Sequence, residues 1–319
     1  MSALDAAARQ DLLNRALQHP LEKVDGLDPD YRGKVRDVFH RGDELFLVAT
    51  DRVSAFDVVL GTVPLKGALL TEQSTFWLQK TADICPTHLV DRVAPQVMRC
   101  KKAEPLPIEM IVRGYLAGSL MRAKPEERGR AYGLSLPTDL KDYQKFDAPL
   151  LTPTTKAEVG DHDAPIALAD IPSQLGVKPA HLERCVEVSQ QLYAAGAKFA
   201  EENGLLLVDT KYEFGLVDGE VVVIDEVHTA DSSRFWDAAS YADRVGAGKA
   251  PVMLDKERLR RWLIEQGFQG EGTPPVLTDD VRTDLAAHYW ELTERVLGTP
   301  FVPDLDAVAN VSNTLRDLL

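Results

Sequence analysis

Asp209, Lys211 and Glu213 alternate along one short stretch of the chain. Alternate residues of a β-strand share one face of the sheet, so these ionisable side chains are expected to project together. Val208 and Phe214 are expected to point towards the core. Because the stretch is strongly apolar at its start, we predict that the three ionisable side chains line a cleft.

A second apolar stretch follows and ends at Asp225. A two-residue turn at Asp218-Gly219 would pair residue 217 with 220 and place Glu213 and Asp225 on opposite faces, whereas a three-residue loop would place them on one face. If they meet, the two carboxylates form a hard oxygen site suited to Mg²⁺ that bridges ATP phosphates. This metal site requires the three-residue loop. The alternative is a surface hairpin in which Lys211 forms salt bridges with its neighbours.

Arg113 is a candidate for binding phosphate, because it directly follows an apolar stretch that reads as a buried strand. Arginine offers two parallel donors to a phosphate group, and the glycines that follow let the backbone approach a ligand. Ser119 adds a hydroxyl group. The alternative is a strand end at which Arg113 pairs with an acid.

Arg234 is a second candidate. Asp231 or Ser232 is predicted to cap a helix, and helix N-termini attract anions. Arg234 then lies in the first turn, which is a mildly unfavourable place for a cation unless an anion is nearby. The alternative is an arginine that packs on Trp236.

Lys34 and Arg36 follow Gly33 and are predicted to lie on one face of a hairpin, where they would cover nucleotide phosphates. The glycine and lysine spacing of a P-loop is absent. A solvated basic strand is an equally good interpretation of these residues alone.

The stretch from 152 to 163 combines several threonines with Lys156 and His162. It lies in a long segment rich in Pro, Gly, Thr and charge, and long loops in compact domains are often functional. A lid that closes on substrate is one interpretation, and a solvated loop is the other.

These motifs need a scaffold of mixed helices and antiparallel hairpins, which is an α+β fold. Strands are predicted over 34–39, 44–49, 107–112, 205–214 and 220–226. Helices are predicted over 4–18, 70–82, 178–203, 256–266, 278–297 and 304–318, with an irregular segment over 124–165.

Bulk composition narrows the function classes. A formal net charge of -14 disfavours binding to nucleic acid, and no strong basic patch appears. No apolar run is long enough to span a bilayer, and the first residues do not form a secretory signal. The three cysteines are scattered and form no zinc or disulfide pattern, which fits a reducing cytoplasm.

The order of the motifs resembles the SAICAR synthase family over roughly residues 31 to 240. The resemblance is carried by the stretches 33–37, 51–57, 109–119, 154–163, 209–215 and 225–236. It implies an ATP-grasp-like fold of two lobes with antiparallel sheets and a helical C-terminal tail. Residues 1–115 would form the lobe that covers the nucleotide, and residues 116–319 the larger lobe that binds substrate and metal.

The resemblance also implies an activity. The family joins L-aspartate to the carboxylate of the imidazole ribonucleotide CAIR in purine biosynthesis, and it uses ATP with Mg²⁺. The implied partners are these small molecules, and the chain is expected to be a monomer or a small homo-oligomer in the cytoplasm. Tyr115 stands where some members carry a basic residue, and residues 250–319 match least.

Carried over by motif, each candidate acquires a role. Lys34, Val35 and Arg36 would contact ATP, and Glu213 and Asp225 would hold Mg²⁺. Lys211 and Asp209 would be catalytic residues beside the reacting groups. The substrate-binding set is Arg113, Ser119, Arg234, Lys156, Glu158, His162 and Asp163, of which the first three would bind the 5'-phosphate.

The sequence leaves the general base open between Asp209 and His162. Rival activities are another ATP-dependent carboxylate–amine ligase, a small-molecule kinase on the same scaffold and a non-catalytic nucleotide-binding regulator.

Overall fold

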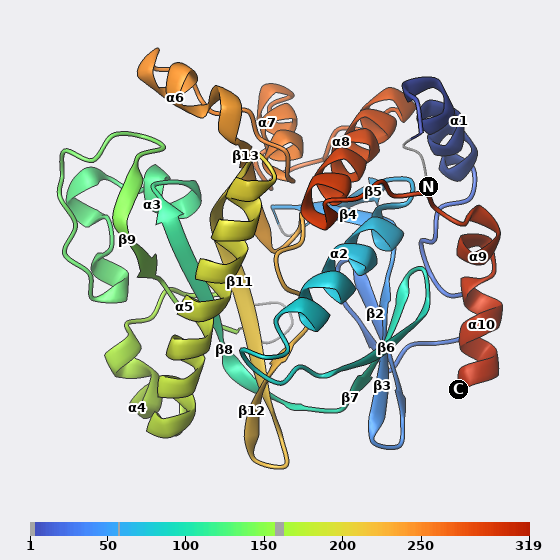
Figure 1. Cartoon of the computed structure of the whole chain (residues 1–319), viewed down its shortest axis with the longest axis horizontal. Helices are drawn as coiled ribbons and strands as arrows, with labels where there is room; N and C mark the ends of the chain where they lie inside the picture. The colour runs from blue at the N-terminus through green and yellow to red at the C-terminus, as the bar shows by residue number, and fades with distance from the viewer. Residues whose placement is uncertain (1–3, 57, 157–162) are drawn as a thin grey trace.

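The computed structural model describes residues 4–56, 58–156 and 163–319. Two antiparallel sheets dominate the molecule, and helices cover them (Figure 1). This arrangement confirms the predicted α+β class with antiparallel sheets and C-terminal helices. No helix within the described residues is long and apolar enough to cross a membrane.

The first sheet has five strands in the order β1-β2-β3-β7-β6. Their bounds are β1 Tyr31–Arg32, β2 Arg36–Arg41, β3 Glu44–Ala49, β6 Leu89–Ala94 and β7 Val97–Lys101. Strand alternation sends Leu47 into the main core, towards α2 (Lys66–Lys80), and Phe46 and Val48 into a second cluster, where α10 (Val311–Leu318) packs. A separate hairpin, β4 (Arg52–Ala55) and β5 (Val58–Thr62), precedes α2.

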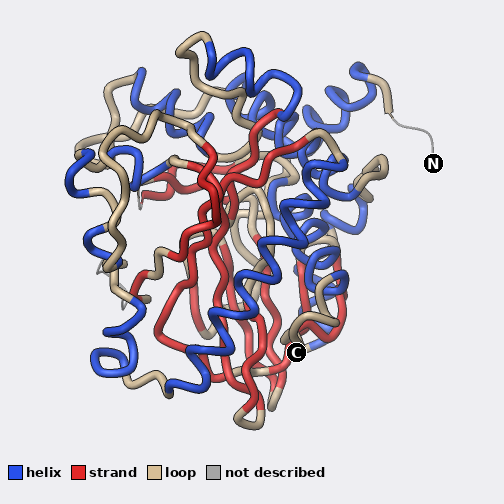
Figure 2. The backbone as a smooth tube through the Cα atoms, turned by 60° about the vertical axis from the view of Figure 1, so that its left-hand side comes forward, coloured by secondary structure: helices blue, strands red, loops and turns tan. Residues whose placement is uncertain are grey.

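The second sheet is built around β11 (Leu205–Val217). Three strands pair with β11, namely β8 (Glu104–Tyr115), β12 (Glu220–Ile224) and β13 (Ser233–Asp237). Two further strands, β9 (Lys145–Leu151) and β10 (Thr154–Thr155), pair with β8. The long helix α5 (Pro179–Glu202) lies along one face of this sheet (Figures 1 and 2). The opposite face is therefore left for polar side chains.

The hairpin that joins β11 to β12 has the two-residue turn. Val217 pairs with Glu220, and Glu213 pairs with Ile224. Asp218 and Gly219 both have positive φ, at 54° and 83°, as two-residue hairpin turns favour. Of the two turns that Asp218-Gly219 permits, the structure therefore has the one that the metal site was not expected to use. Strand β12 ends at Ile224, and Asp225 has a left-handed backbone with φ of 66°, so strand alternation does not fix where its side chain points.

Three further predictions about elements need correction. The segment 124–165 is not wholly irregular, because β9 and β10 pair with β8; Pro149 is tolerated because β9 is an edge strand. No helix begins at Asp231 or Ser232, because residues 233–237 extend as β13, which pairs with β11. The helix predicted over 304–318 is interrupted at Asn310, which separates α9 (Leu305–Ala309) from α10.

The remaining helices surround the sheets. They are α1 (Ala6–Leu17), α3 (Gly118–Arg122), α4 (Ile171–Leu175), α6 (Ala238–Gly246), α7 (Glu257–Glu265) and α8 (Asp279–Leu297). Helix α8 packs on α2, where the Gln73 side chain donates to Thr293 at 2.6 Å. The strands of the first sheet end at Lys101, and β8 belongs to the second sheet. Two lobes divided at residue 115 remain a proposal.

Candidate active site

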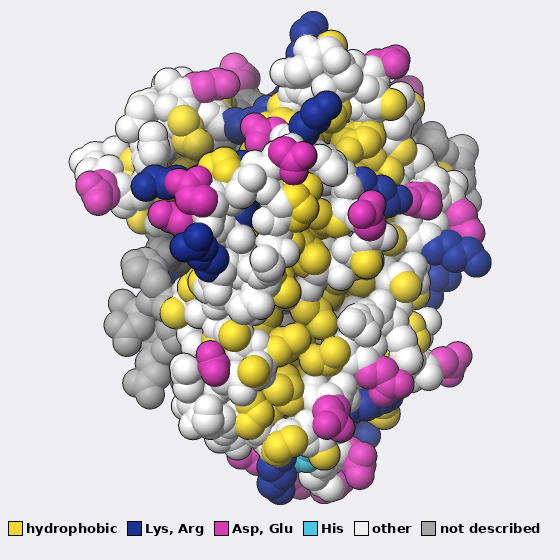
Figure 3. Space-filling view, turned by 90° about the vertical axis from the view of Figure 1, so that its left-hand side faces the viewer, with side chains coloured by type: hydrophobic (Ala, Val, Ile, Leu, Met, Phe, Trp, Pro, Cys, Tyr) yellow, Lys and Arg dark blue, Asp and Glu magenta, His cyan; other side chains and the backbone are white. Residues whose placement is uncertain are grey.

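Two cavities adjoin β8 and β11. A cavity of about 420 Å³ between β9 and α5 has a largely apolar lining that includes Phe146, Pro149 and Ala194, and hydrophobic side chains gather on this side of the molecule (Figure 3). A cavity of about 300 Å³ on the opposite side of the sheet is lined mainly by charged and polar groups. The second cavity, called here the polar pocket, contains the groups that could act on a charged substrate.

One end of the polar pocket holds a pair of arginines on a shared carboxylate. Arg113 lies opposite Asp209 on the neighbouring strand and donates to it at 2.9 Å, and Arg234 on β13 donates to the same carboxylate at 2.8 and 2.9 Å. Arg113 also donates to the Ser119 hydroxyl at 3.3 Å and to that of Thr152 at 2.8 Å. Five donor contacts thus fix two planar guanidinium groups, an arrangement suited to a phosphate.

Lys211 lies further along β11 and is held between two acids. Its ammonium group donates to Glu109 and to Glu213, both at 2.6 Å. Lys156 also forms an ion pair with Glu213. Burial lowers the pKa of Lys211, but Glu213, Glu109 and Asp225 outweigh it and raise the pKa well above its usual range. Lys211 therefore stays protonated and acts as a fixed positive charge.

Glu213 is ionised despite its burial. Burial raises the pKa of this carboxyl, but Lys211 and Lys156 outweigh it and hold the pKa at about 2. The pKa of neighbouring Glu109 is raised, because burial there exceeds the opposing effect of Lys211. The cluster therefore keeps one firmly anionic carboxylate beside two ammonium groups.

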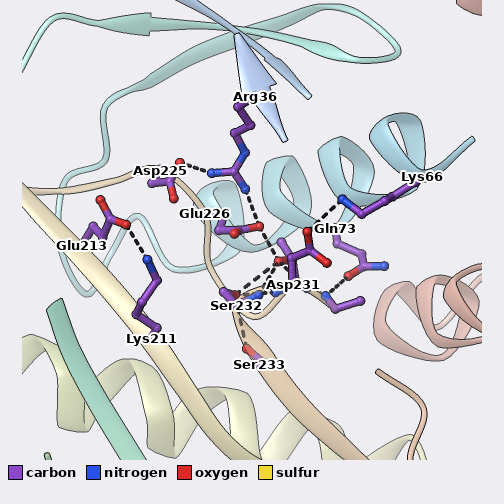
Figure 4. Close-up of polar contacts among 12 residues, drawn as sticks. Arg36, Lys66, Gln73, Lys211, Glu213, Asp225, Glu226, Asp231, Ser232 and Ser233 are labelled. Atoms are coloured by element: carbon purple, nitrogen blue, oxygen red, sulfur yellow. Dashed lines mark hydrogen bonds and ion pairs between the residues drawn. The ribbon is translucent and has the colours of Figure 1, made fainter. Parts of the chain in front are cut away.

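Asp225 approaches this cluster from the end of β12 (Figure 4). Arg36 forms ion pairs with Asp225 and with Glu226, and both Asp225 and Glu213 raise the pKa of Lys156 against the effect of its burial. Asp225 and Glu213 thus both act on Lys156, although the hairpin has the turn that was expected to place the two carboxylates on opposite faces. The pairing of these acids around a metal ion stays a prediction.

Glu213 and Asp225 offer oxygen ligands that fit Mg²⁺. The described part of the chain contains no group of three His, Cys, Asp or Glu side chains poised to hold a metal ion. Mg²⁺ needs no such cage, because it commonly uses one or two carboxylates together with substrate phosphates and water. Lys156 and Arg36 at present neutralise the two acids, and a divalent cation could take over this role.

The segment that carries Lys34 is held by Arg52. The Arg52 guanidinium donates to the backbone carbonyl groups of Gly33 and Lys34, both at 3.1 Å, and forms an ion pair of 2.7 Å with the buried Asp37. The carbonyl of Val35 accepts from the backbone and the hydroxyl of Thr50. Lys34 itself is exposed. The sequence predictions for Lys34 and Val35 as ATP contacts stay predictions.

The loop that carries Asp225, Glu226 and Asp231 is anchored by buried side chains of β11 and α2. Buried His228 shares a hydrogen bond of 2.6 Å with the Tyr212 hydroxyl and stands edge-on to Trp77, with ring centroids 4.5 Å apart. The side chain of Gln73 accepts from the backbone of Ala230 at 2.8 Å. Because these anchors come from β11 and α2, the loop cannot shift without disturbing the core.

His228 makes stability depend on pH. Burial lowers its pKa to about 3, so between pH 6.5 and 3 the unfolded chain binds a proton here that the folded chain does not. The free energy of unfolding then falls as pH decreases, by at most about 1.4 kcal/mol per pH unit. His228→Asn removes this contribution, and asparagine tolerates the positive φ. Between pH 7 and 5 we expect the urea-unfolding stability of wild type to fall more than that of the variant, by about 2 kcal/mol.

The matched control is His181→Asn, at a partly exposed position on α5. Its stability should run parallel to that of the wild type across this pH range. Equal pH slopes for wild type and His228→Asn would show that His228 is not held neutral by the fold.

Most predicted site residues lie either around Asp209, with its two arginines, or around Lys211, with its two acids. Glu158 and His162 lie outside the described residues, and Asp163 is exposed next to them. Asp209 is bound to two arginines, an arrangement that favours a positioning role over that of a base. The sequence offered a phosphate-binding Arg113 and an Arg113 paired with an acid as alternatives. The guanidinium group does pair with an acid, Asp209, and it also lines the polar pocket.

Sequence reasoning missed several charged residues of the site. Glu109 shares the site face of β8 with Arg113, four residues later, so strand alternation carried a signal for it. The polar pocket also contains Arg122, Asp231, Asp255, Lys256, Glu257 and Arg260. The residues from 255 onwards carried no signal, because only the fold brings α7 to the pocket.

Comparison with known proteins gives a consistent result. The sequence profile described as SAICAR synthetase matches residues 30–275. The phosphoribosylaminoimidazole-succinocarboxamide synthase of Cytophaga hutchinsonii is 44% identical over 274 residues, covering 85% of this chain and 88% of the relative. The enzyme of the same name from Bacteroides fragilis is 43% identical over 278 residues, covering 86% of this chain and 88% of the relative.

Among solved structures, the SAICAR synthase of Saccharomyces cerevisiae complexed with SAICAR is similar in fold. Its TM-score is 0.76 at 32% sequence identity, and the match covers 88% of this chain and 98% of the yeast chain. The similarity therefore extends over both sheets and is not confined to the motifs around β11.

Proposed function

Since this chain belongs to the SAICAR synthetase family, we propose that it joins L-aspartate to the carboxylate of CAIR with ATP, forming SAICAR, ADP and phosphate. The observation that carries this proposal is the polar pocket. It runs from the Arg113–Asp209–Arg234 group to Lys211, which is bonded to Glu213. One pocket thus combines a phosphate-binding end with an end suited to charge neutralisation.

The 5'-phosphate of CAIR is placed on Arg113, Ser119 and Arg234. Both guanidinium groups are oriented before the ligand arrives, because Asp209 fixes them. Pre-orientation lowers the entropic cost of binding and sets the position of the distant imidazole carboxylate. Asp209 acts in this scheme by holding the arginines.

The imidazole carboxylate then lies near Lys211. A carboxylate is a poor electrophile, because its leaving group would be oxide, so its oxygen first takes the γ-phosphoryl group of ATP and ADP leaves. The permanent charge of Lys211 neutralises oxygen atoms of the transferring group. Mg²⁺ held by Glu213 and Asp225 would supply further charge neutralisation on the phosphates. Arg36, which pairs with Asp225 and Glu226, would contact the nucleotide phosphates in this scheme.

The aspartate amine attacks the activated carbonyl carbon in the second step. The new carbon–nitrogen bond forms as phosphate leaves with the bridging oxygen, and one proton is lost from the nitrogen. Lys211 remains protonated, so it does not accept this proton. Positioning and fixed charge therefore account for most of the proposed catalysis.

We place the enzyme in the cytoplasm. Cys85, Cys100 and Cys185 are all free and buried, which is consistent with a reducing compartment. The expectation of a monomer or small homo-oligomer is checked by light scattering of the purified protein.

Omission of single components tests the proposal. The purified protein is given ATP, Mg²⁺, CAIR and L-aspartate, and ADP release is followed while each is left out in turn. We expect release to require all four, with the succinocarboxamide product found by mass spectrometry. Release that is independent of aspartate would indicate a kinase, and ATP binding without release would indicate a regulator.

A further inference from the structure

Lys256 lies at the wall of the polar pocket, where it forms a long salt bridge with Asp231. It directly precedes α7, and its side chain retains 18% of its exposure. The nearest carboxylate in the described structure belongs to Asp231, 3.8 Å from the lysine nitrogen, which is too far for a good hydrogen bond.

Asp231 is already neutralised by other groups. The ammonium of Lys66, which is fully buried, lies 2.8 Å from one carboxylate oxygen, and the Tyr289 hydroxyl donates to the other at 3.0 Å (Figure 4 shows Lys66 and Asp231). Two lysines thus share one acid, since Lys256 as well as Lys66 lowers the pKa of Asp231. Two positive charges at this wall have one close carboxylate between them, and only Lys66 lies within hydrogen-bond distance of it.

The surroundings of Lys256 add to this excess of positive charge. The N-terminus of a helix carries a partial positive charge, which makes a lysine next to it unfavourable unless an anion is present. Arg260, one turn further along α7, also lines the pocket, and its Nε is buried without a hydrogen-bond partner in the described structure. Burial lowers the pKa of Lys256, and Lys66 and Arg260 lower it further, although Asp231 opposes them. An anionic ligand would relieve each of these costs.

The proposed reaction brings three kinds of anionic group to the site besides ATP. The 5'-phosphate is assigned to Arg113, Ser119 and Arg234, and the reacting carboxylate to Lys211. The carboxylates of aspartate remain without a partner. Lys256 lies on the same pocket as both other subsites, so a carboxylate bound there could hold the amine close to the reacting carbon.

We propose that Lys256 binds a carboxylate group of the aspartate substrate, and that Lys66 is a positioning residue that keeps Lys256 available by neutralising Asp231. This inference rests on the proposed function and deepens it, because it assigns the subsite of the second substrate. It also explains why a lysine directly precedes α7.

Lys256→Met keeps an unbranched side chain that lacks only the terminal nitrogen position, and it removes the charge. We expect the KM for aspartate to rise roughly 10- to 100-fold, the loss of one charge-assisted hydrogen bond. The KM values for CAIR and ATP should change by less than about twofold, well below the effect of losing one such bond. Lys256→Arg should restore most of the affinity for aspartate, which a merely structural role would not predict.

Amide analogues identify the carboxylate. L-Asparagine lacks the side-chain carboxylate, and L-isoasparagine lacks the α-carboxylate. Wild type should bind both less well than aspartate, measured as inhibition constants against aspartate. In Lys256→Met, one of the two analogues should bind as well as aspartate does. The carboxylate that this analogue lacks is then the group that Lys256 contacts in the wild type.

Arg258→Met provides the control, since Arg258 lies on the same helix and pairs with the exposed Asp284. It should leave every KM unchanged. An unchanged KM for aspartate in Lys256→Met, or a rise confined to CAIR, would overturn the assignment while the wild type still showed aspartate-dependent turnover. Absence of that turnover in the wild type would instead overturn the proposed function, and the assignment with it.

Discussion

Glu213→Gln is expected to reduce kcat/KM for CAIR roughly a thousandfold, the scale of losing a fixed charge at the reacting centre. Glutamine fills the same volume but carries no charge. Lys156 loses its anionic partner, Lys211 loses one of its two, and Mg²⁺ loses one of its two proposed carboxylates. Because the second ammonium–carboxylate contact of Lys211, with Glu109, remains, we expect the fold to persist.

Steady-state rates at varied Mg²⁺ concentration test this prediction. The Mg²⁺ concentration that gives half-maximal rate should rise along with the loss of rate. Glu220→Gln is the matched control, because Glu220 is exposed at the turn of the same hairpin; its rate should equal that of the wild type. Turnover by Glu213→Gln with an unchanged Mg²⁺ dependence would remove Glu213 from the metal site.

The central part of the site could be predicted from strand alternation. Lys211 and Glu213 share one face of β11, and this conclusion needs only the period of a strand. The pairing of β8 with β11, which places Arg113 opposite Asp209, comes from the fold and was not predicted. The assignment of Val208 and Phe214 to one core was less exact. The pairing of β11 with β13 shifts between Leu207 and Asp209, and Val208 packs with Trp236 in a separate cluster.

Asp225 illustrates a limit of such reasoning. The parity of the hairpin decides which faces its residues share only while both strands continue. Strand β12 ends one residue before Asp225, and the left-handed backbone there redirects the side chain. Aspartate adopts this conformation more readily than most residues, but nothing local in the sequence distinguishes this outcome from a continued strand.

Lys66, Asp231 and Lys256 illustrate a second limit. They come from α2, from the loop before β13 and from the residue before α7, and only the tertiary structure brings their side chains together. Asp231 and Ser232 also read as a helix start, because both are good N-cap residues. Pairing with β11 overrode that local preference and extended the chain as β13. Contacts made by tertiary packing carry no periodic signal.

Asp209→Asn is expected to raise the KM for CAIR roughly a hundredfold and to lower the free energy of unfolding by about 3 kcal/mol, the scale of breaking a buried ion pair. Both Arg113 and Asp209 are buried, with 4% and 5% of their side chains exposed. Asparagine offers one acceptor oxygen where the arginines use two, and its amide group would face a guanidinium. Arg113 and Arg234 would lose their orientation together.

The same variant decides between the two roles that the sequence left open for Asp209. A residue that holds the phosphate-binding arginines affects mainly the KM for CAIR and leaves the shape of the pH–rate profile intact. A general base would instead affect kcat, and the acidic limb of the profile would disappear. Asp237→Asn is the control, because Asp237 caps α6, where asparagine caps equally well. A loss of kcat with an unchanged KM for CAIR would make Asp209 the base and leave the arginines to be oriented by Ser119, Thr152 and Glu257 alone.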